Sequence, residues 1–549
     1  MPEPDSDRVR IVPLGGLGQI GMNCMAIEQS DGILVVDCGA GFPEDDLGVD
    51  VLHPDFSWLL DQRERVSGIF LTHGHEDHVG ALPYLLGELD VPVFGPPHAL
   101  GVARRRLDDH GFGQNELDLR DAHAGQVYRL GPFEVEPIRV THSIVEASAL
   151  CIRTRAGTIV HSGDFNLDDD PPDGEPTDEA RLTALGDEGV SLLLSDSTNI
   201  DVEVRQGSER GVGLAVEQLV AQARGRVVIA MFASNVQRLI LFGEMARRVG
   251  RKICLLGRSL DSHVEIARQI RRLSWPSDLL VSADEAQSMP RDRLLVLAGG
   301  TQAERNSAMR RLASGIHPAL KLEEGDSVIM SSRAIPGNER GVFHMMNDLL
   351  RLGVHVHSRV TDPGIHTSGH AARAEQRRMI ELCRPSAFLP VHGSLHHLLR
   401  HAELARDVGV SSTAVVENGT TAALRAGRVA PDDTVPYGIV HVAMGGEEIE
   451  PEVLHTRAEL GRAGIVVGVL TVDRGQLAGP PTLSVRGVPH VDGDDGAQRI
   501  LAKELARAYE TYRPGRGLEL EEWARRTVRR KVEDLSGTRP TIEIKVVEV

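Results

Sequence analysis

Short apolar segments that end in polar residues dominate the first 200 residues of the chain. They are rich in β-branched residues and are separated by turns such as SDG and RAG, so we predict β-strands there. The pattern occurs in RVRIVPL, GILVVDCG, GIFLTH, PFEVEPIRVTH, GTIVHSGDF and VSLLLSDS.

From about residue 203 the pattern changes to strands that alternate with amphipathic helices. RVVIAMF precedes a helical pattern at 235–249, and KICLL precedes another at 260–273. RLLVLAGG and DSVIMSS each precede a further helix. This alternation predicts a parallel, doubly wound sheet.

Polar-ended strands return near residue 353, in HVHSRVTD and AFLPVHG, and a helix is expected at 394–408. Residues 431–455 read as a linker. The remainder has two amphipathic helical segments and a closing strand, TIEIKVVEV, and predicts a small α+β unit.

Composition agrees with an α/β protein of about three domains. The chain has 549 residues, 41% hydrophobic and 3% aromatic, with 57 Gly and 29 Pro. The net charge of −19 counts mildly against a nucleic-acid ligand, although bound divalent cations reverse the sign locally.

Cysteine usage and the absence of targeting signals predict a cytoplasmic protein. The five cysteines form no CxxC pair and read as reduced thiols. MPEPDSDRVR has no apolar signal core, and no apolar run is long enough to cross a bilayer.

The stretch LTHGHEDHVGALPYLL concentrates polar side chains directly after an apolar strand. His73, His75 and Asp77 share one side of an extended chain, and His78 follows. Imidazoles and a carboxylate suit Zn²⁺ or Mn²⁺, and two such ions need about six or seven ligands. Three more candidates stand where other strands stop: His142, Asp164 and His392.

A histidine that merely follows a strand is more simply a turn or surface residue. We apply that interpretation to five others: His53, His98, His110, His123 and His401. The H-x-H-x-D-H spacing favours a metal site instead.

The segment GGLGQIGMN imitates a dinucleotide-binding fingerprint, with Asp37 downstream. A true fingerprint needs a helix next, whereas MNCMAIEQ reads better as a strand. We therefore expect a Gly-rich turn, with Asp37 supporting the metal side of the sheet.

THGHEDHVGAL, with its later ligand candidates in order, resembles the metallo-β-lactamase superfamily. That resemblance implies one metal ion held by His73, His75 and His142. It implies a second held by Asp77, His78 and His392, with Asp164 bridging the two.

The long α/β block before His392 resembles the β-CASP insertion of metallo-β-lactamase nucleases, with Asp196 and His370 at two of its motif positions. PLGGLGQIGMN, GFPEDDLGVD, FASNVQR, SSRAIPGNE, HTSGHA and LPVHGSLHHLLRHAELA, in this order, are similar to the bacterial ribonuclease J family. The resemblance implies a metallo-β-lactamase αββα sandwich with an inserted Rossmann-like β-CASP domain and a small C-terminal α+β domain. The expected division is sandwich at 1–202 and 353–430, insertion at 203–352, linker at 431–455 and C-terminal domain at 456–549.

Two divalent ions suit a phosphodiester substrate. We assign catalytic roles to Asp77, to His370 as general acid and to Asp196 as the group that orients it. From the family we carry over a pocket for an RNA 5′-monophosphate, made by Ser331, Ser332, Arg333, His366, Thr367, Ser368, Gly369 and His370. From the residues alone, a helix cap and a polar turn remain open as alternatives for these two segments.

Other motif residues have simpler interpretations. Asn235 and Arg238 are expected as a helix cap and an exposed helical arginine, and His396 and His397 as helix-surface or supporting residues. Family members hold a structural cation with an acid near Asp50, but Ala443 stands where the second acid is expected, which puts that site in doubt. The basic run ARRTVRRK reads as a solvated helix face.

The leading hypothesis is a two-metal ribonuclease, with two Zn²⁺ or Mn²⁺ ions per subunit. The resemblance implies 5′→3′ exonuclease action on 5′-monophosphorylated RNA, with or without internal cleavage, in mRNA decay and rRNA maturation. It also implies a homodimer or a dimer of dimers and partners in RNA degradation. The alternatives are a DNA-directed β-CASP nuclease, a thioester or lactam hydrolase, and a non-catalytic RNA-binding scaffold.

Overall fold

The computed structural model describes residues 8–43, 47–113, 117–205, 207–335, 337–512 and 519–549. Residues 1–7 of the N-terminal stretch that we searched for a signal peptide and residues 44–46 of GFPEDDLGVD lie outside these ranges. The chain forms two compact units, one of residues 1–44 and 51–440 and the other of residues 45–50 and 441–549.

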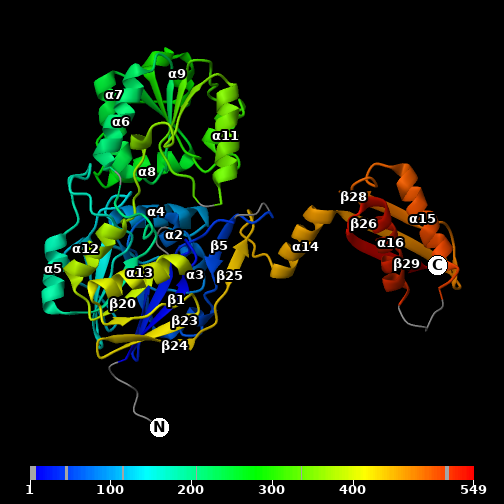
Figure 1. Ribbon diagram of the computed structural model, residues 1–549, viewed down its shortest axis with the longest axis horizontal. Coiled ribbons are helices and arrows are strands. Elements are labelled where there is room, and N and C mark those ends of the chain that lie inside the picture. Colours follow the sequence, from blue (N-terminus) through cyan, green and yellow to red (C-terminus); the bar gives the residue numbers. More distant parts are fainter. Residues whose placement is uncertain (1–7, 44–46, 114–116, 206, 336, 513–518) are drawn as a thin grey trace, which may run out of the picture. The chain divides into compact units, whose positions relative to one another are not determined.

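Two mixed β-sheets form the core of the first unit (Figure 1). The first sheet has the order β24 (Arg428–Thr434), β23 (Thr420–Arg425), β1 (Val9–Gly15), β3 (Cys24–Gln29), β4 (Gly32–Val36), β6 (Val66–Phe70), β7 (Val93–Gly95) and β8 (Leu119–Asp121). The second has the order β22 (Ser412–Thr413), β20 (Ala387–Val391), β13 (Val190–Asp196), β12 (Gly157–His161), β11 (Ser148–Thr154), β10 (Phe133–Arg139) and β9 (Tyr128–Leu130).

Apolar side chains from both sheets form one buried cluster, so the sheets pack face to face. Phe70 of the first sheet and Phe133 of the second belong to it. Helices α5 (Glu179–Glu188), α12 (Arg373–Cys383) and α13 (Leu395–Val408) cover the outer face of the second sheet through another cluster. Helix α4 (Pro97–Asp109) packs on β7 and β8 of the first. The arrangement is the predicted αββα sandwich.

The inserted segment forms a six-stranded sheet that is parallel throughout. Its order is β16 (Leu280–Val281), β15 (Lys252–Leu256), β17 (Leu294–Ala298), β14 (Val227–Ala230), β18 (Ser327–Met330) and β19 (His355–His357). One face packs against α6 (Glu209–Gln222), α7 (Val236–Val249) and α8 (Arg258–Gln269). The other packs against α9 (Ala283–Ser288), α10 (Ala308–Ala313) and α11 (Glu339–Arg351). Figure 1 shows α6 and α7 on one side of the strands and α11 on the other.

One predicted strand has a different place. We expected the strand near 355 to return to the sandwich, but β19 pairs in parallel with β18 of the inserted sheet. A β-α-β crossover through α11 sets the next strand beside its predecessor, which accounts for the pairing. The domain boundaries that we gave remain a prediction.

The Gly-rich segment near the N-terminus carries no helix. Residues 15–29, all of which are described, contain β2 (Leu17–Gly18) and β3. Gly16, Gly18 and Gly21 have positive φ angles of 88°, 83° and 83°, which suits a tight turn between strands. A βαβ dinucleotide site is therefore absent from this described stretch.

The second unit is a small α+β structure. Strand β26 (Ile465–Asp473) lies between β28 (Thr482–Arg486) and β29 (Thr541–Glu548), and also pairs with β27 (Gln476–Leu477). Helices α15 (Asp495–Tyr509) and α16 (Leu520–Ser536) share one buried cluster with this sheet. The predicted linker contains the end of β24, β25 (Ile439–Val442) and the start of α14 (Pro451–Ala463). Among the described helices, none is both long and apolar enough to cross a membrane.

Candidate active site

All seven predicted metal ligands lie just beyond strand ends, at one edge of the sandwich. His73 and His75 follow β6, and Asp77 and His78 lie on the short helix α2 (Glu76–Val79). His142, Asp164 and His392 follow β10, β12 and β20. We call these seven residues the metal centre.

The first group of the metal centre is His73, His75, His142 and Asp164, whose nearest ligand atoms lie within 4.8 Å of one another. His75 Nδ1 is 3.1 Å from His73 Nε2 and 3.2 Å from His142 Nε2. Asp164 Oδ2 is 3.8 Å from both of those Nε2 atoms.

The second group is Asp77, His78, Asp164 and His392. His78 Nε2 is 3.3 Å from Asp164 Oδ2 and 3.6 Å from Asp77 Oδ2, which is 3.4 Å from His392 Nε2. Asp164 belongs to both groups, which is the arrangement expected of a carboxylate that bridges two ions.

The donor atoms fit a pair of divalent cations. Nitrogen ligands at about 2.0–2.1 Å from a tetrahedral ion lie about 3.3 Å apart, close to the separations around His75. Five imidazoles and two carboxylates form the donor set that suits Zn²⁺ or Mn²⁺. The metal centre can therefore hold two such ions.

Neighbouring polar groups fix which imidazole nitrogen faces the metal centre. His78 Nδ1 donates to Asp37 Oδ2 at 2.8 Å, and His142 Nδ1 donates to Gly369 O at 2.8 Å. His73 Nδ1 lies 3.0 Å from Thr72 Oγ1. Each of these contacts turns Nε2 toward the centre, as in ligating histidines.

Burial and neighbouring charges shift the pKa values of these groups in the directions that favour binding of a cation. Burial, together with neighbouring imidazoles, holds the pKa of His73 and of His75 well below the usual value and lowers the pKa of His142 to about 4. These imidazoles are therefore neutral ligands at neutral pH. Burial opposes ionisation of Asp164, but His392 and His78 hold its pKa well below the usual value.

His370 and Asp196 form a third polar group beside the metal centre. His370 Nδ1 is 2.9 Å from Asp196 Oδ2 and 3.8 Å from Asp164 Oδ2. Burial lowers the pKa of His370, but Asp196 and Asp164 act in the opposite direction, and the pKa is raised. His370 thus carries a proton into a higher pH range than a free imidazole.

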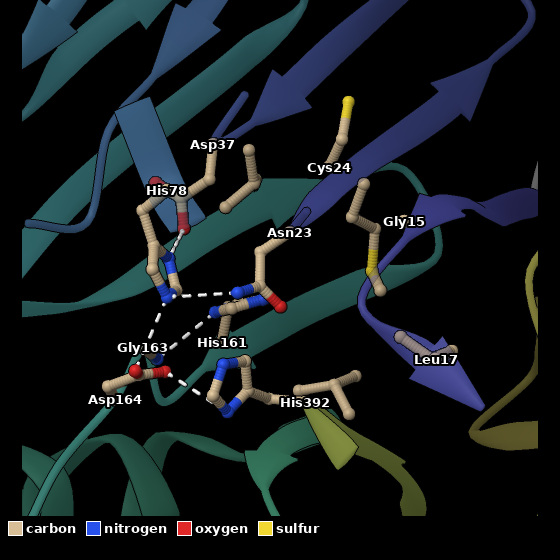
Figure 2. Close-up of a pocket in the computed structure, with 13 residues that line it drawn as sticks. Gly15, Leu17, Asn23, Cys24, Asp37, His78, His161, Gly163, Asp164 and His392 are labelled. Atoms are coloured by element: carbon tan, nitrogen blue, oxygen red, sulfur yellow. Dashed lines mark hydrogen bonds and ion pairs between the residues drawn. The ribbon is translucent and has the colours of Figure 1, made fainter. Parts of the chain in front are cut away.

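Several supporting residues escaped the sequence interpretation. Asn23 Nδ2 lies 3.1 Å from His78 Nε2 and also donates to the Asp77 backbone oxygen and carboxylate. Thr198 Oγ1 lies 2.6 Å from His392 Nδ1 and donates to Asp196. Figure 2 shows Asn23, Asp37 and Asp164 around the His78 ring. Asp37, in contrast, was predicted as a supporting residue from its position at the end of an apolar strand.

The second predicted site, which we call the end pocket, is formed by the segments 331–333 and 366–369. The first follows β18, and the second follows the short helix η3 (Pro363–Ile365). Gly369 accepts from the His142 ring and His370 pairs with Asp196, so the end pocket adjoins the metal centre.

The serine hydroxyl groups of the end pocket differ in whether their protons are already donated in hydrogen bonds within the chain. Ser331 is fully buried and donates its proton to Ile365 O at 2.7 Å. Ser368 Oγ accepts from Asn199 and from the His370 amide, and among the described residues its own proton has no acceptor. In the described part of the chain, the Ser332 hydroxyl makes no hydrogen bond, although the residue is only 9% exposed.

Guanidinium groups surround the end pocket. Burial, followed by Arg238, Arg359 and Arg333, holds the pKa of His366 well below the usual value. Arg333 and Arg359 are exposed and form no ion pair within the described residues. Their charge is available for an anion, and Arg359 was missed by the sequence interpretation.

Two expectations about single residues are wrong. Arg238 is not exposed on its helix but only 1% accessible, because it forms an ion pair with Glu209 inside the insertion. Three of the histidines expected at the surface, His53, His98 and His401, are buried among packed elements. Asn235 does cap α7, by accepting from the Arg238 amide.

The remaining predicted positions have simple roles. His396 is exposed and pairs with Asp201, and His397 lies near Ser394. Within the described residues, Asp50 belongs to no group of three or more metal-binding side chains. The basic run on α16 includes Arg525 and Arg526, which pair with Glu522.

Three family models match consecutive parts of the chain. The metallo-β-lactamase superfamily matches residues 17–197, the ribonuclease J β-CASP domain matches 224–349, and the Zn-dependent metallo-hydrolase RNA specificity domain matches 353–415. Ribonuclease J of Helicobacter pylori is 38% identical over 474 residues, which are 86% of this chain and 69% of that protein. The chain belongs to the ribonuclease J family.

Another relative supports membership of the ribonuclease J family. Ribonuclease J of Sinorhizobium meliloti is 35% identical over 555 residues, 98% of this chain and 97% of its own. A crystal structure of a protein of unknown function from Enterococcus faecalis V583 aligns with a TM-score of 0.52 and 16% identity, over 79% of this chain and all of that one, and it shows the fold alone. Family membership makes the chain a metal-dependent, RNA-hydrolysing nuclease with a metallo-β-lactamase core and a β-CASP insertion.

Proposed function

We propose that this enzyme hydrolyses RNA from a 5′-monophosphorylated end in the 5′→3′ direction. The observation that carries the proposal is the continuity of the end pocket with the metal centre. Ser368 offers a free hydroxyl proton to a terminal phosphate, and His370, two residues on, bonds to Asp196. Two residues span at most about 7 Å of backbone, so a held 5′ end lies close to the reacting group.

Two divalent cations, when bound at the metal centre, neutralise phosphate charge and supply a hydroxide nucleophile near neutral pH. We propose Zn²⁺ as the resident ion, with Mn²⁺ as the alternative, because the donor set is rich in imidazole. His73, His75, His142 and Asp164 would hold one ion, and Asp77, His78, His392 and Asp164 the other.

His370 acts as the general acid in this proposal. Asp196 accepts from Nδ1 of His370 and orients the ring, so that Nε2 gives its proton to the departing 3′-oxygen. Water attack at phosphorus leaves a 5′-phosphate on the shortened RNA, which is again a substrate for the end pocket. Asp77 is essential because it completes the second group and lies beside His392.

The end pocket selects the 5′-monophosphate through hydroxyls and guanidinium charge. Ser332 and Ser368 donate hydrogen bonds, and Arg333 and Arg359 supply unpaired positive charge. Such charge-assisted bonds suit a dianionic terminal phosphate.

Digestion of end-labelled RNA tests this function. We expect RNA with a 5′-monophosphate to be degraded to mononucleotides in the presence of Zn²⁺ or Mn²⁺, and matched RNA with a 5′-triphosphate or 5′-hydroxyl to be degraded more slowly. Equal degradation of all three ends would contradict the end pocket, and preferential degradation of a matched DNA would contradict the substrate.

We also propose assembly as a homodimer in the cytoplasm. The sheet of the second unit exposes Val467 and Val469 of β26, 43% and 39% accessible, and exposed apolar side chains support self-association. All five cysteines are free and buried, as in a reducing compartment. Sedimentation of the wild type and of Val467→Asp tests the dimer, and a monomeric wild type would contradict it.

A further inference from the structure

Arg238 on α7 is the largest fully buried side chain of the described chain, and it lies between the two segments of the end pocket. On one side its guanidinium forms a fork with Glu209, with Nε 3.0 Å from Oε2 and Nη2 2.7 Å from Oε1. Glu209 is itself buried at the start of α6. The pair is therefore neutral within the insertion.

On the other side the same guanidinium reaches both segments of the end pocket. Nη1 donates to Ser331 O at 2.6 Å and lies 3.3 Å from Ser331 Oγ and from His366 Nδ1. Nη2 donates to Thr367 O at 3.4 Å. A guanidinium has five N–H donors, and these contacts together with Glu209 occupy them.

An arginine with occupied donors and a neutralising carboxylate is a poor phosphate ligand. Its geometry instead sets the separation of two segments that are distant in sequence, since Ser331 follows β18 of the inserted sheet and Thr367 lies in the chain that returns to the sandwich. Ser331 extends the link, because its hydroxyl donates to Ile365 O directly before the second segment.

We propose that Arg238 is a positioning residue for recognition of the RNA 5′ end, and that Ser331 acts with it rather than as a phosphate ligand. This inference rests on the proposed function of the end pocket. Phosphate contact is then left to Ser332, Ser368 and the two unpaired arginines, while Arg238 holds the segments that carry them.

The test compares Arg238→Lys and Ser331→Ala with the wild type on RNA that ends in a 5′-monophosphate or a 5′-hydroxyl. Lysine keeps the charge but cannot form the planar fork that spans four partner residues. We expect Arg238→Lys to raise KM for 5′-monophosphorylated RNA about 10- to 100-fold, with kcat within about threefold. Ser331→Ala should raise the same KM about two- to tenfold. Neither variant should change kcat/KM for the 5′-hydroxyl RNA by more than about twofold.

Arg251→Lys is the matched control. Arg251 is also buried in the insertion, but it donates to Gly225 O and Leu294 O at the edge where the strands begin, away from the end pocket. We expect its kinetics to match the wild type, while thermal unfolding reports any general loss of stability in all three variants.

The possible results distinguish failure of this inference from failure of the proposed function on which it rests. A wild type with no preference for the 5′-monophosphate overturns both. A wild-type preference that survives in Arg238→Lys and Ser331→Ala overturns the inference alone. If Arg238→Lys loses activity equally on both RNAs and Arg251→Lys is affected to the same degree, then the role of Arg238 is generally structural. That result also overturns the inference. If Arg238→Lys does not fold, the KM of Ser331→Ala decides.

Discussion

The metal centre and the end pocket lie next to each other but are built on different principles. In the metal centre, side chains that follow four strand ends converge directly, and supporting residues such as Asp37 only fix ring orientation. In the end pocket, the segments that face the ligand are held by a side chain that cannot touch it, Arg238. Contact with the ligand therefore identifies the residues that form the metal centre. It identifies only some of the residues on which the end pocket depends.

Removing the general acid should produce the largest effect. We expect His370→Ala to lower kcat about 10²- to 10⁴-fold, because the departing oxygen loses its proton donor. His396→Ala is the control, since this exposed histidine pairs with Asp201 and is not part of the metal centre. Single-turnover hydrolysis measures both, and a His370→Ala rate near the wild type would remove His370 from the mechanism.

Disturbing the support of the metal centre should have an intermediate effect. Asp37→Asn removes the charge that accepts the proton of His78 Nδ1, so we expect metal affinity to fall about 10- to 100-fold. Competition with a chelator measures this affinity. Asp31→Asn, at an exposed surface pair with Arg155, should leave it unchanged.

A direct ligand of the end pocket should affect substrate affinity and not the chemistry. Ser332→Ala is expected to raise KM for 5′-monophosphorylated RNA about tenfold or more, since a hydrogen bond to a charged group is lost. kcat should stay within about twofold. A fall in kcat with unchanged KM would mean that Ser332 serves the metal centre, and the comparison between the two sites would fail.

The smallest expected effect is that of pH on the end pocket. Burial and three arginines hold the pKa of His366 well below its usual value, so this ring should stay neutral between pH 8 and 6.5. Protonation would add positive charge and lower KM for a phosphorylated end. We therefore expect KM to be flat in this range in both the wild type and His366→Gln. A KM that falls as the pH is lowered toward 6.5 in the wild type alone would contradict the assignment.

The sequence predicted most of the metal centre and less of the end pocket for a physical reason. Polar residues such as His142 and Asp164 stand directly after apolar strands, and strand ends meet at one edge, so local pattern predicts their convergence. Arg238 lies on an amphipathic helix, where an exposed arginine is the ordinary expectation. Contacts with residues distant in sequence, such as Glu209, 29 residues away, explain its burial.

Fold prediction had a similar limit. The α/β class, the inserted parallel sheet and the absence of a dinucleotide helix followed from periodicity and turn residues. The place of β19 did not, because three residues, His355–His357, carry too short a pattern to reveal their partner. Thr198 and Asn23 were missed because their partners lie 194 and 54 residues away.

Metal content per chain tests the central claim most directly. The claim is that seven side chains hold two divalent cations that share Asp164. We predict two Zn²⁺ or Mn²⁺ ions bound per wild-type chain after equilibrium dialysis, and one or none in Asp164→Ala. Two ions retained by the folded Asp164→Ala chain would contradict the shared carboxylate, and a wild type that binds no ion would contradict the metal centre itself.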